Sequence, residues 1–259
     1  MMIIVRKITP YLIAVLASFA AALIFIAAMG FNVFQAYETI LFTSFRTPNG
    51  FVQTLLKFIP LTLQALAFTV PLTAGKFNIG GEGQMILGAI AASAVGITFS
   101  DLPLPILLPL VILAGVIAGA IYGLVPAWLL YRFGLNEILT TVLLNFVSFA
   151  IIDLVATGPW RDPGAGHPTT VPIGAGGFLP MLISNPPLHS GILIAVVVAA
   201  GIYIYTTRTT GGYELVATGA NPRAAAVYGI NVKRMFVFSL VLAGALAGLS
   251  GAIEVAGVQ

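Results

Sequence analysis

The chain has 259 residues, of which 59% are hydrophobic and only 7% are charged, and its formal net charge is +3. A soluble domain usually carries about a quarter charged residues, so this composition excludes a soluble globular protein. The apolar runs are continuous and do not alternate with polar residues, which indicates an integral membrane protein built from helices rather than a β-barrel. The chain has no cysteine, which excludes disulfides and cysteine-ligated metal or iron–sulfur sites.

Seven apolar segments are candidates to cross a bilayer, which takes about 20 residues, although the third of them is short. Arg6 and Lys7 precede the first segment, but it is longer than the core of a signal peptide, so we expect an uncleaved span. The mixed segment 31–57 and the Pro- and Gly-rich loop 157–190 are expected to lie outside. The expected spans are 11–30, 58–74, 85–99, 106–130, 138–156, 191–205 and 235–255.

The positive charges predict the orientation of these spans. With the N-terminus in the cytoplasm, eight Lys and Arg residues fall in inner segments and three in outer ones. The segment 206–234 is therefore expected to be a cytoplasmic loop, and the net charge does not point to nucleic acid. Seven spans leave the C-terminus outside without a polar tail, so we expect a C-terminally truncated chain. Residues 1–259 are expected to form a single transmembrane domain, an all-α polytopic helix bundle.

The segment 206–234 combines positive charge with the signals of a short helix. Asn221 suits the N-cap, Pro222 suits the first helical position, and Gly229 is placed to end the helix. Residues 223–228 are rich in alanine, the best helix former. A longer helix is expected to be broken by three upstream glycines: Gly211, Gly212 and Gly219.

Small side chains on this short helix would let a partner approach closely, with Ala224 and Ala225 at its centre. Arg223 and Glu214 are the charged candidates for such a contact. A plain cytoplasmic linker that happens to be helical is the alternative. The residue pattern leaves both interpretations open.

The stretch 75–84, GKFNIGGEGQ, places four glycines and three polar residues, Asn78, Glu82 and Gln84, between two apolar segments. Irregular polar backbone at membrane depth is tolerated only inside protein or beside a watery cavity, and glycine-interrupted segments point to transport sites. A simple cytoplasmic turn marked by Lys76 is the alternative. The spacing fits neither a P-loop nor GxGxxG.

A second polar cluster follows at 135–145, LNEILTTVLLN. On a helix, Glu137, Thr141 and Asn145 share one face. Such a face either forms hydrogen bonds with a neighbouring helix or lines a path. Glu137 at the start of the helix also suits the helix dipole.

Small-residue motifs in the fourth and seventh expected spans predict close helix packing, either within the bundle or in a dimer: Gly115, Gly119 and Gly123, then Gly244 and Gly248. Two acidic residues lie near the outer ends of spans, Asp153 and Glu254, and either could touch a solute or simply be solvated.

No catalytic or metal-binding arrangement is visible. His167 and His189 lie in the external loop without further ligands, so no metal and no cofactor are expected. Neither a Ser–His–Asp set nor HExxH is present, and catalysis is not expected.

Five phrases together resemble permease subunits of bacterial ABC importers: FNIGGEGQMILGA (77–89), LNEILTTVLLN (135–145), WRDP (160–163), GYELVATGANPRAAAVYGINVKR (212–234) and LAGALAGLSGAIEVAG (242–257). The similarity is to the nucleoside and simple-sugar type, within the set that includes ribose and branched-chain amino acid permeases. It covers about residues 75–257, in the same order as in the family.

The resemblance implies that 212–234 contains the coupling helix, which docks into a separate cytoplasmic ATPase. It also implies a second permease subunit, alike or paralogous, and an extracytoplasmic substrate-binding lipoprotein. The solute would be a small polar molecule. The candidates for its path remain the polar residues of the stretches 75–84 and 135–145 described above: Asn78, Glu82, Gln84, Glu137, Thr141 and Asn145. Because family members usually continue with further spans, the similarity also suggests truncation.

Three other classes compete with this interpretation. An ion-coupled secondary transporter also uses broken helices, but this chain offers few acidic residues inside its spans for coupling. A channel or a purely structural membrane subunit would not need a docking loop. A membrane enzyme lacks a catalytic constellation here.

Overall fold

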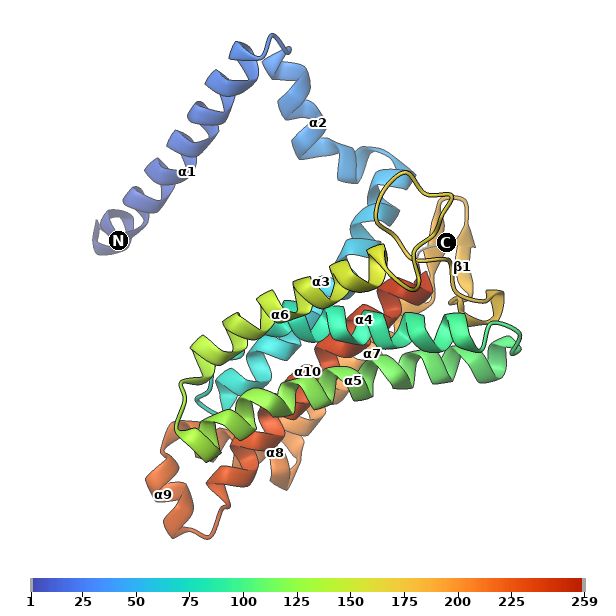
Figure 1. Ribbon diagram of the computed structural model, residues 1–259. Helices are drawn as coiled ribbons and strands as arrows, with labels where there is room; N and C mark the ends of the chain where they lie inside the picture. The colour runs from blue at the N-terminus through green and yellow to red at the C-terminus, as the bar shows by residue number, and fades with distance from the viewer. Residues whose placement is uncertain (1, 258–259) are drawn as a thin grey trace. The chain divides into compact units, whose positions relative to one another are not determined.

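The computed structural model describes residues 2–257, with side chains from residue 9 onward. The chain divides into two compact units, Met1–Thr54 and Leu55–Gln259, and each is described by itself. Most of the described chain is helical (Figure 1). The elements in order are α1 (Met2–Ala28), α2 (Val33–Arg46), α3 (Pro48–Thr73), α4 (Gly81–Thr98), α5 (Leu104–Phe133), α6 (Glu137–Thr157), η1 (Ala175–Gly177), β1 (Met181–Ser184), β2 (Pro187–His189), α7 (Gly191–Arg208), α8 (Thr210–Ala220), α9 (Pro222–Val227) and α10 (Val232–Gly257).

The first unit contains α1, α2 and the first turns of α3. Asn32 caps α2, because its side-chain oxygen accepts a hydrogen bond from the backbone N–H of Gln35. The rings of Phe19 and Tyr37 lie with their centroids 5.8 Å apart, and the Tyr37 hydroxyl donates to the Phe19 carbonyl. These contacts hold α1 and α2 together.

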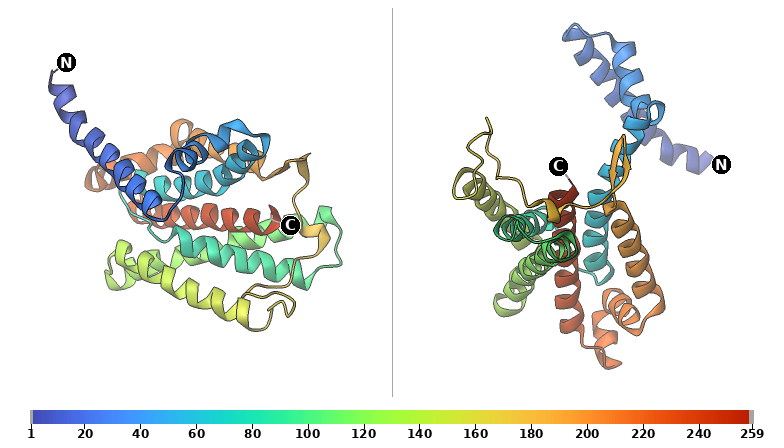
Figure 2. Two further views of the ribbon diagram at one scale, coloured as in Figure 1. Left: turned by 90° about the horizontal axis from the view of Figure 1, so that it is seen from above. Right: turned by 90° about the vertical axis from the view of Figure 1, so that its right-hand side faces the viewer.

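The second unit is a helix bundle with α10 at its centre (Figure 2). Most residues of α10 are buried, and they form apolar clusters with residues of α3, α4, α5 and α7. We call the end of this bundle that carries α8 and α9 the α9 end, and the opposite end, which carries the β1–β2 hairpin, the hairpin end (Figure 1). The core therefore runs along α10 from one end to the other.

Small residues bring α5 and α10 into backbone contact, as the glycine motifs predict for packing within the bundle. A Cβ atom added at Gly119 would lie 2.2 Å from the carbonyl oxygen of Gly244, and one at Gly248 would lie 2.2 Å from that of Gly115. A Cβ added at Gly88 of α4 would likewise lie 2.5 Å from the Cα of Gly248. Three helices therefore converge where no side chain intervenes.

Within residues 2–257, six helices are long and apolar enough to cross a membrane, where seven were predicted. They are Thr9–Ala28, Pro48–Thr73, Leu104–Phe133, Glu137–Thr157, Gly191–Arg208 and Val232–Gly257. The helix missing from this set is α4, the expected third span, whose 18 residues begin with the polar stretch Gly81-Glu-Gly-Gln84. Residues 81–84, which were predicted to lie in a loop, therefore belong to this helix. Their polarity shortens its apolar part.

The expected boundary of the second span is also wrong. The helix α3 begins at Pro48 and not at 58, so part of the segment predicted to be external belongs to the span. Pro48 occupies the first helical position, where its missing N–H has no partner to lose. Pro60 lies inside the helix without ending it, as membrane helices allow.

The three glycines expected to break the helix in 206–234 lie inside α8. They serve close packing instead. A Cβ at Gly212 would lie 2.0 Å from the Tyr205 carbonyl oxygen, and one at Gly219 would lie 2.1 Å from the Thr73 carbonyl oxygen. Thr209 caps α8 by accepting a hydrogen bond from the Gly212 N–H.

The loop 157–190 contains the β1–β2 hairpin, which the residue pattern does not predict. Backbone hydrogen bonds attach this loop to the hairpin end of the bundle. The Gly174 N–H donates to the carbonyl of Gly96 in the last turn of α4. The Leu179 N–H donates to the carbonyl of Ala256 near the end of α10. The loop therefore covers the ends of these two helices.

Candidate functional site

The helix α9 forms as the sequence predicts. The Asn221 side-chain oxygen accepts hydrogen bonds from the backbone N–H groups of Arg223 and Ala224, both at 3.1 Å. Pro222 occupies the first position, and Gly229 follows the helix with a φ of +86°. The cap and the left-handed glycine therefore define both ends of a six-residue helix.

A groove of about 540 Å³ runs along α8 and α9. Tyr213, Glu214 and Ala217 of α8 line one side, and Ala224 and Tyr228 line the other. Both tyrosines are strongly exposed. The groove thus has an aromatic rim and one carboxylate, Glu214, in its wall.

The alanines of α9 do not all face outward. Ala225 is 4% exposed, whereas Val227 and Tyr228 are 86% and 87% exposed, and Arg223 is exposed as well. The helix therefore packs Ala225 against the rest of the bundle. It presents Arg223, Val227 and Tyr228 on its outer side.

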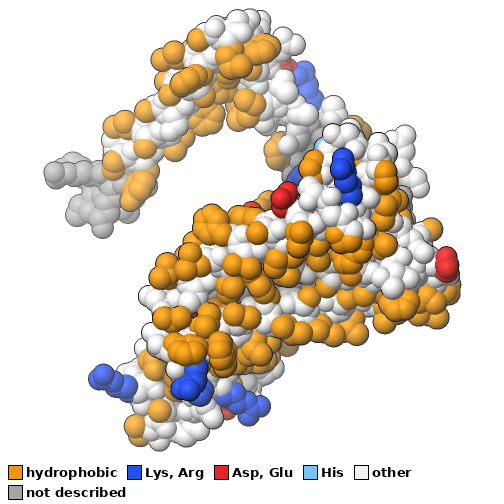
Figure 3. Space-filling view, in the orientation of Figure 1, with side chains coloured by type: hydrophobic (Ala, Val, Ile, Leu, Met, Phe, Trp, Pro, Cys, Tyr) orange, Lys and Arg blue, Asp and Glu red, His pale blue; other side chains and the backbone are white. Residues whose placement is uncertain are grey.

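Positive charge gathers at the α9 end, while hydrophobic side chains cover much of the surface between the two ends (Figure 3). Of the eight Lys and Arg residues in 55–257, only Lys57 and Arg161 lie at the hairpin end. The other six are Lys76, Arg132, Arg208, Arg223, Lys233 and Arg234.

The loop 74–80 packs directly on the last turn of α8. A Cβ at Gly219 would lie 2.1 Å from the Thr73 carbonyl oxygen and 3.0 Å from the backbone nitrogen of Gly75. Gly75 has a φ of +76°, which glycine adopts readily and other residues rarely do. The loop and α8 therefore meet backbone to backbone.

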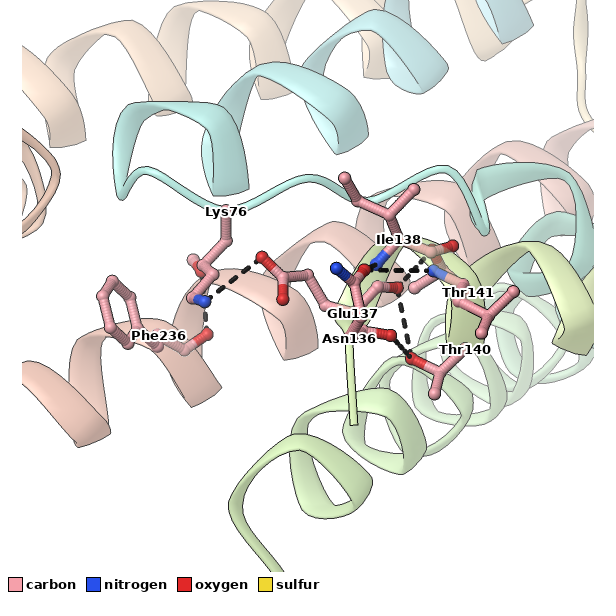
Figure 4. A network of polar contacts seen from close by, with 9 residues as sticks. Lys76, Asn136, Glu137, Ile138, Thr140, Thr141 and Phe236 are labelled. Carbon is pink, nitrogen blue, oxygen red and sulfur yellow. Dashed lines mark hydrogen bonds and ion pairs between the residues drawn. The ribbon is translucent and has the colours of Figure 1, made fainter. Parts of the chain in front are cut away.

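Lys76 joins this loop to α6 and α10 (Figure 4). Its ammonium nitrogen lies 3.2 Å from Glu137 Oε1 and 5.0 Å from the centroid of the Phe236 ring. The side chains of Lys76 and Glu137 are 19% and 12% exposed, so solvent screens this ion pair less than a surface pair. Lys76 therefore links the loop 74–80, α6 and α10 at the α9 end.

Asn78 and Gln84 stabilise the irregular backbone that follows. Asn78 Nδ2 donates to Gln84 Oε1 at 2.8 Å, and Gln84 Nε2 donates to Asn78 Oδ1 at 3.1 Å. Asn78 Oδ1 also accepts from the Gly80 N–H. Both side chains are buried, and their mutual pairing satisfies them away from water.

The polar face of α6 completes this network. Thr141 Oγ1 accepts from the Ile79 N–H at 3.3 Å and donates to the Glu137 carbonyl at 2.7 Å (Figure 4). Asn145 accepts from the Gly83 N–H at 2.9 Å and donates to the Ile79 carbonyl at 3.0 Å. The two polar stretches singled out in the sequence therefore lie against each other.

The side chains predicted to line a translocation path differ in their exposure to solvent. Asn78, Gln84 and Thr141 are buried and use their polar atoms within the network. Glu82 is exposed on the first turn of α4, and Asn145 is half-exposed. The first three shape the loop, and the last two present polar atoms at its surface.

The structure also gives roles to residues for which the sequence predicts only a place in the topology, or no role. Lys76 and Phe236 are examples, since no local pattern pairs residues so far apart. His189 is another: it is buried, its Nδ1 accepts from the Gly191 N–H at 3.2 Å, and burial lowers its pKa. Across residues 2–257, no three His, Asp or Glu side chains come together as metal ligands.

Comparison with known proteins matches residues 50–259 to the family described as branched-chain amino acid transport system / permease component. The glucose ABC transporter permease protein TsgB13 of Haloferax volcanii is 34% identical over 97% of this chain and 68% of its own length. The nucleoside ABC transporter permease protein NupB of Lactococcus lactis is 32% identical over 96% of this chain and 70% of its own. The guanosine ABC transporter permease protein NupP of Bacillus subtilis is 31% identical, over 94% and 70%. No solved structure matches this chain.

These relatives are permease subunits of ATP-binding cassette systems, in which a separate subunit hydrolyses ATP and a binding protein supplies the solute. The six apolar helices found within residues 2–257 agree with a multi-pass protein of the plasma membrane. The chain therefore belongs to the branched-chain amino acid transport system permease family, as a membrane-spanning subunit of an ABC importer for small polar solutes.

Proposed function

We propose that this permease subunit imports a nucleoside or a simple sugar, driven by a separate ATPase that acts through α9. The glucose, nucleoside and guanosine permeases that resemble it, each more than 30% identical over most of the chain, support this solute class. The observation that carries the mechanism is α9 itself, a helix capped at both ends with Arg223, Val227 and Tyr228 exposed on it.

The α9 end faces the cytoplasm in this proposal, with the N-terminus of the chain on the same side. Six of the eight Lys and Arg residues in 55–257 lie at that end. Basic residues next to membrane helices are enriched on the cytoplasmic side. The segment 206–234 is then accessible to a soluble ATPase, and the loop 157–190 lies outside.

In this proposal, α9 is the coupling helix. Arg223 and the exposed side chains of Val227 and Tyr228 contact the ATPase, since Arg and Tyr are the residue types that most often dominate interfaces. The α8–α9 groove, with Glu214 and Ala224 in its walls, receives an apolar segment of the ATPase. The shape of this groove depends on further residues that begin, end or anchor α9: Asn221, Pro222, Ala225 and Gly229.

Movement of α9 reaches the membrane helices through the backbone contact between Gly219 and residues 73–75. No flexible side chain lies at this contact, so displacement of α8 displaces the loop 74–80. Lys76 then passes the movement to α6 through Glu137 and to α10 through Phe236. This series of contacts adds to the direct chain connection between α9 and α10 through residues 228–231.

The translocation path passes the polar loop and α6. Glu82 and Asn145 offer polar atoms to the solute, while Asn78, Gln84 and Thr141 hold the loop in the shape that exposes them. Glu137 lies nearer the α9 end, where its ion pair with Lys76 closes the loop against α6. A change in that pair would alter access from the cytoplasm.

The working transporter contains a second permease subunit, identical or paralogous, two ATPase subunits and an extracytoplasmic binding lipoprotein. One subunit supplies only half of a central path between two permeases. Purification from detergent with the natural partners would show which of them remain bound.

The test uses the purified transporter reconstituted in liposomes, with ATP inside and radiolabelled guanosine or glucose outside. We expect Tyr228→Asp and Arg223→Glu each to lower uptake about tenfold or more, corresponding to the loss of an interface hot spot. Both variants should still elute as folded protein. Arg208→Glu, a charge reversal at the same end but outside the α8–α9 groove, is the matched control and should keep normal uptake.

Normal uptake by both α9 variants would refute the docking surface. Uptake that stops when ionophores collapse the ion gradients, with ATP still present, would instead identify a secondary transporter. Uptake of neither solute class would refute the proposed solutes.

A further inference from the structure

A pocket of about 210 Å³ opens at the hairpin end, where the loop 157–190 lies over the helix bundle. Three separate parts of the chain supply its polar groups: Ser93 comes from α4, Thr170 from the loop and Glu254 from α10. The aromatic ring of Phe178 lines it as well. Helices at the core and a loop outside it thus converge on one small cavity.

Glu254 is the only acidic residue of α10. Within residues 9–257 its carboxylate has no hydrogen-bond or ion-pair partner, although the charge of Lys57 on α3 acts on it from a greater distance. An ionisable side chain in a membrane helix is unfavourable without a partner, and it usually marks a polar ligand or pathway. The bundle itself does not supply that partner.

The hydroxyl groups of Ser93 and Thr170 are also unpaired in the described part of the chain, where each remains available as donor and acceptor. A carboxylate only accepts. The three groups together suit a ligand whose own hydroxyls both donate and accept, while Phe178 offers an apolar ring for a carbon face.

The charge and the size of the pocket further limit which ligands it can bind. The carboxylate of Glu254 disfavours an anion, and the hydroxyl groups of Ser93 and Thr170 suit a neutral polar ligand. A volume of about 210 Å³ is below the roughly 300–1,000 Å³ of pockets for drug-sized ligands. It has room for a single sugar ring but not for a ring together with a purine base.

We propose that this pocket binds the sugar ring of the transported solute, with Glu254 accepting hydrogen bonds from its hydroxyl groups. The inference rests on the proposed function, in which the hairpin end faces outward and receives the solute. The ring belongs either to a free monosaccharide or to the ribosyl part of a nucleoside whose base remains outside the pocket. Asp153, the other acidic residue near an outer helix end, is exposed and does not line this pocket.

The absence of cysteine from the chain allows a direct binding assay. Ser93→Cys introduces a single thiol of nearly the same size, which a maleimide can label in the purified transporter. D-glucose, D-ribose and guanosine serve as probes, with sucrose as a control too large for the pocket. A probe at ten times its dissociation constant should slow labelling about tenfold, since only the empty pocket reacts.

Adding Glu254→Gln to Ser93→Cys should raise the half-protecting concentration about tenfold or more, because a hydrogen bond to a charged group becomes a neutral one. Adding Asp153→Asn should leave it unchanged. Protection by the free sugars and guanosine alike would identify a ring-only site, and protection by guanosine alone would identify a nucleoside site. If Ser93→Cys does not fold, Thr170→Cys places the thiol on the part of the lining that the loop supplies.

Two results would overturn the inference. One is unchanged labelling with every probe in a transporter whose unsubstituted form takes up at least one of them. The other is a half-protecting concentration that Glu254→Gln leaves unaltered. Uptake by the unsubstituted transporter separately decides the proposed function, so protection without uptake would keep the site and refute the transport assignment.

Discussion

The contact between α5 and α10 supports a quantitative prediction, because it joins two backbones without side chains. In Gly119→Ala, the new Cβ would lie 2.2 Å from the Gly244 carbonyl oxygen, whereas ordinary contact begins near 3.4 Å. The helices would have to separate locally by about 1.2 Å, the difference between these distances. Overpacking of this kind costs about 1–3 kcal/mol, and a rigid backbone neighbour favours the upper end.

Gly201→Ala in α7 is the matched control. A Cβ at Gly201 would meet nothing within 4 Å, so this variant gains only the higher helix propensity of alanine, about 0.5–1 kcal/mol. Both substitutions change glycine to alanine inside a membrane-spanning helix. The difference in their free energies of unfolding therefore isolates the clash, and we expect it to be about 1–3 kcal/mol.

The measurement is thermal unfolding of the purified transporter in detergent, followed by the loss of monodisperse protein. For a domain of this size, 1 kcal/mol shifts the midpoint by roughly 2–4 °C. Gly119→Ala should therefore unfold several degrees below Gly201→Ala. Equal midpoints for the two variants would show that α5 and α10 are not in backbone contact.

Two further predictions concern the ends of the bundle. Lys76→Met leaves the carboxylate of Glu137 without its partner and should destabilise the fold by about 1–3 kcal/mol, and adding Glu137→Gln should recover part of the loss. Strict additivity in this double-mutant cycle, measured by thermal unfolding, would show that the two side chains do not interact. Burial lowers the pKa of His189, so the unfolded chain binds its proton more readily, and stability should fall as the pH drops below about 6.5 until it passes the lowered pKa. Unfolding midpoints between about pH 7.5 and 5 should decline less in His189→Gln, and identical declines would contradict the prediction.

The proposed mechanism places different demands on the two ends of the same bundle. At the α9 end, the contact of Gly219 with residues 73–75 has to stay rigid to transmit movement. At the hairpin end, Glu254 and the loop around Phe178 have to admit and release a solute. The glycine contacts of α10 with α5 lie between them, so substitutions there should affect stability and transport together.

Local chemistry in the sequence was sufficient to predict most of the membrane-spanning helices and both ends of α9. Continuous apolar runs determine where membrane helices form, because a backbone in lipid must satisfy its own hydrogen bonds. Asn221 and Gly229 determine where α9 begins and ends, because capping involves only neighbouring residues. The facing glycine motifs were likewise visible as small residues at helical spacing.

Tertiary structure alone decided what those elements do. Glycine is a residue type that breaks helices, yet Gly219 lies within α8. Only glycine fits at this position, because any side chain would clash with the Thr73 carbonyl. Ala225 faces the bundle although the sequence predicts it on the surface that a partner approaches, and Lys76 reaches Glu137 across a stretch of chain that no periodicity links. Propensity and periodicity describe neighbours along the chain, whereas close approach, burial and ion pairing depend on which distant segments the fold brings together.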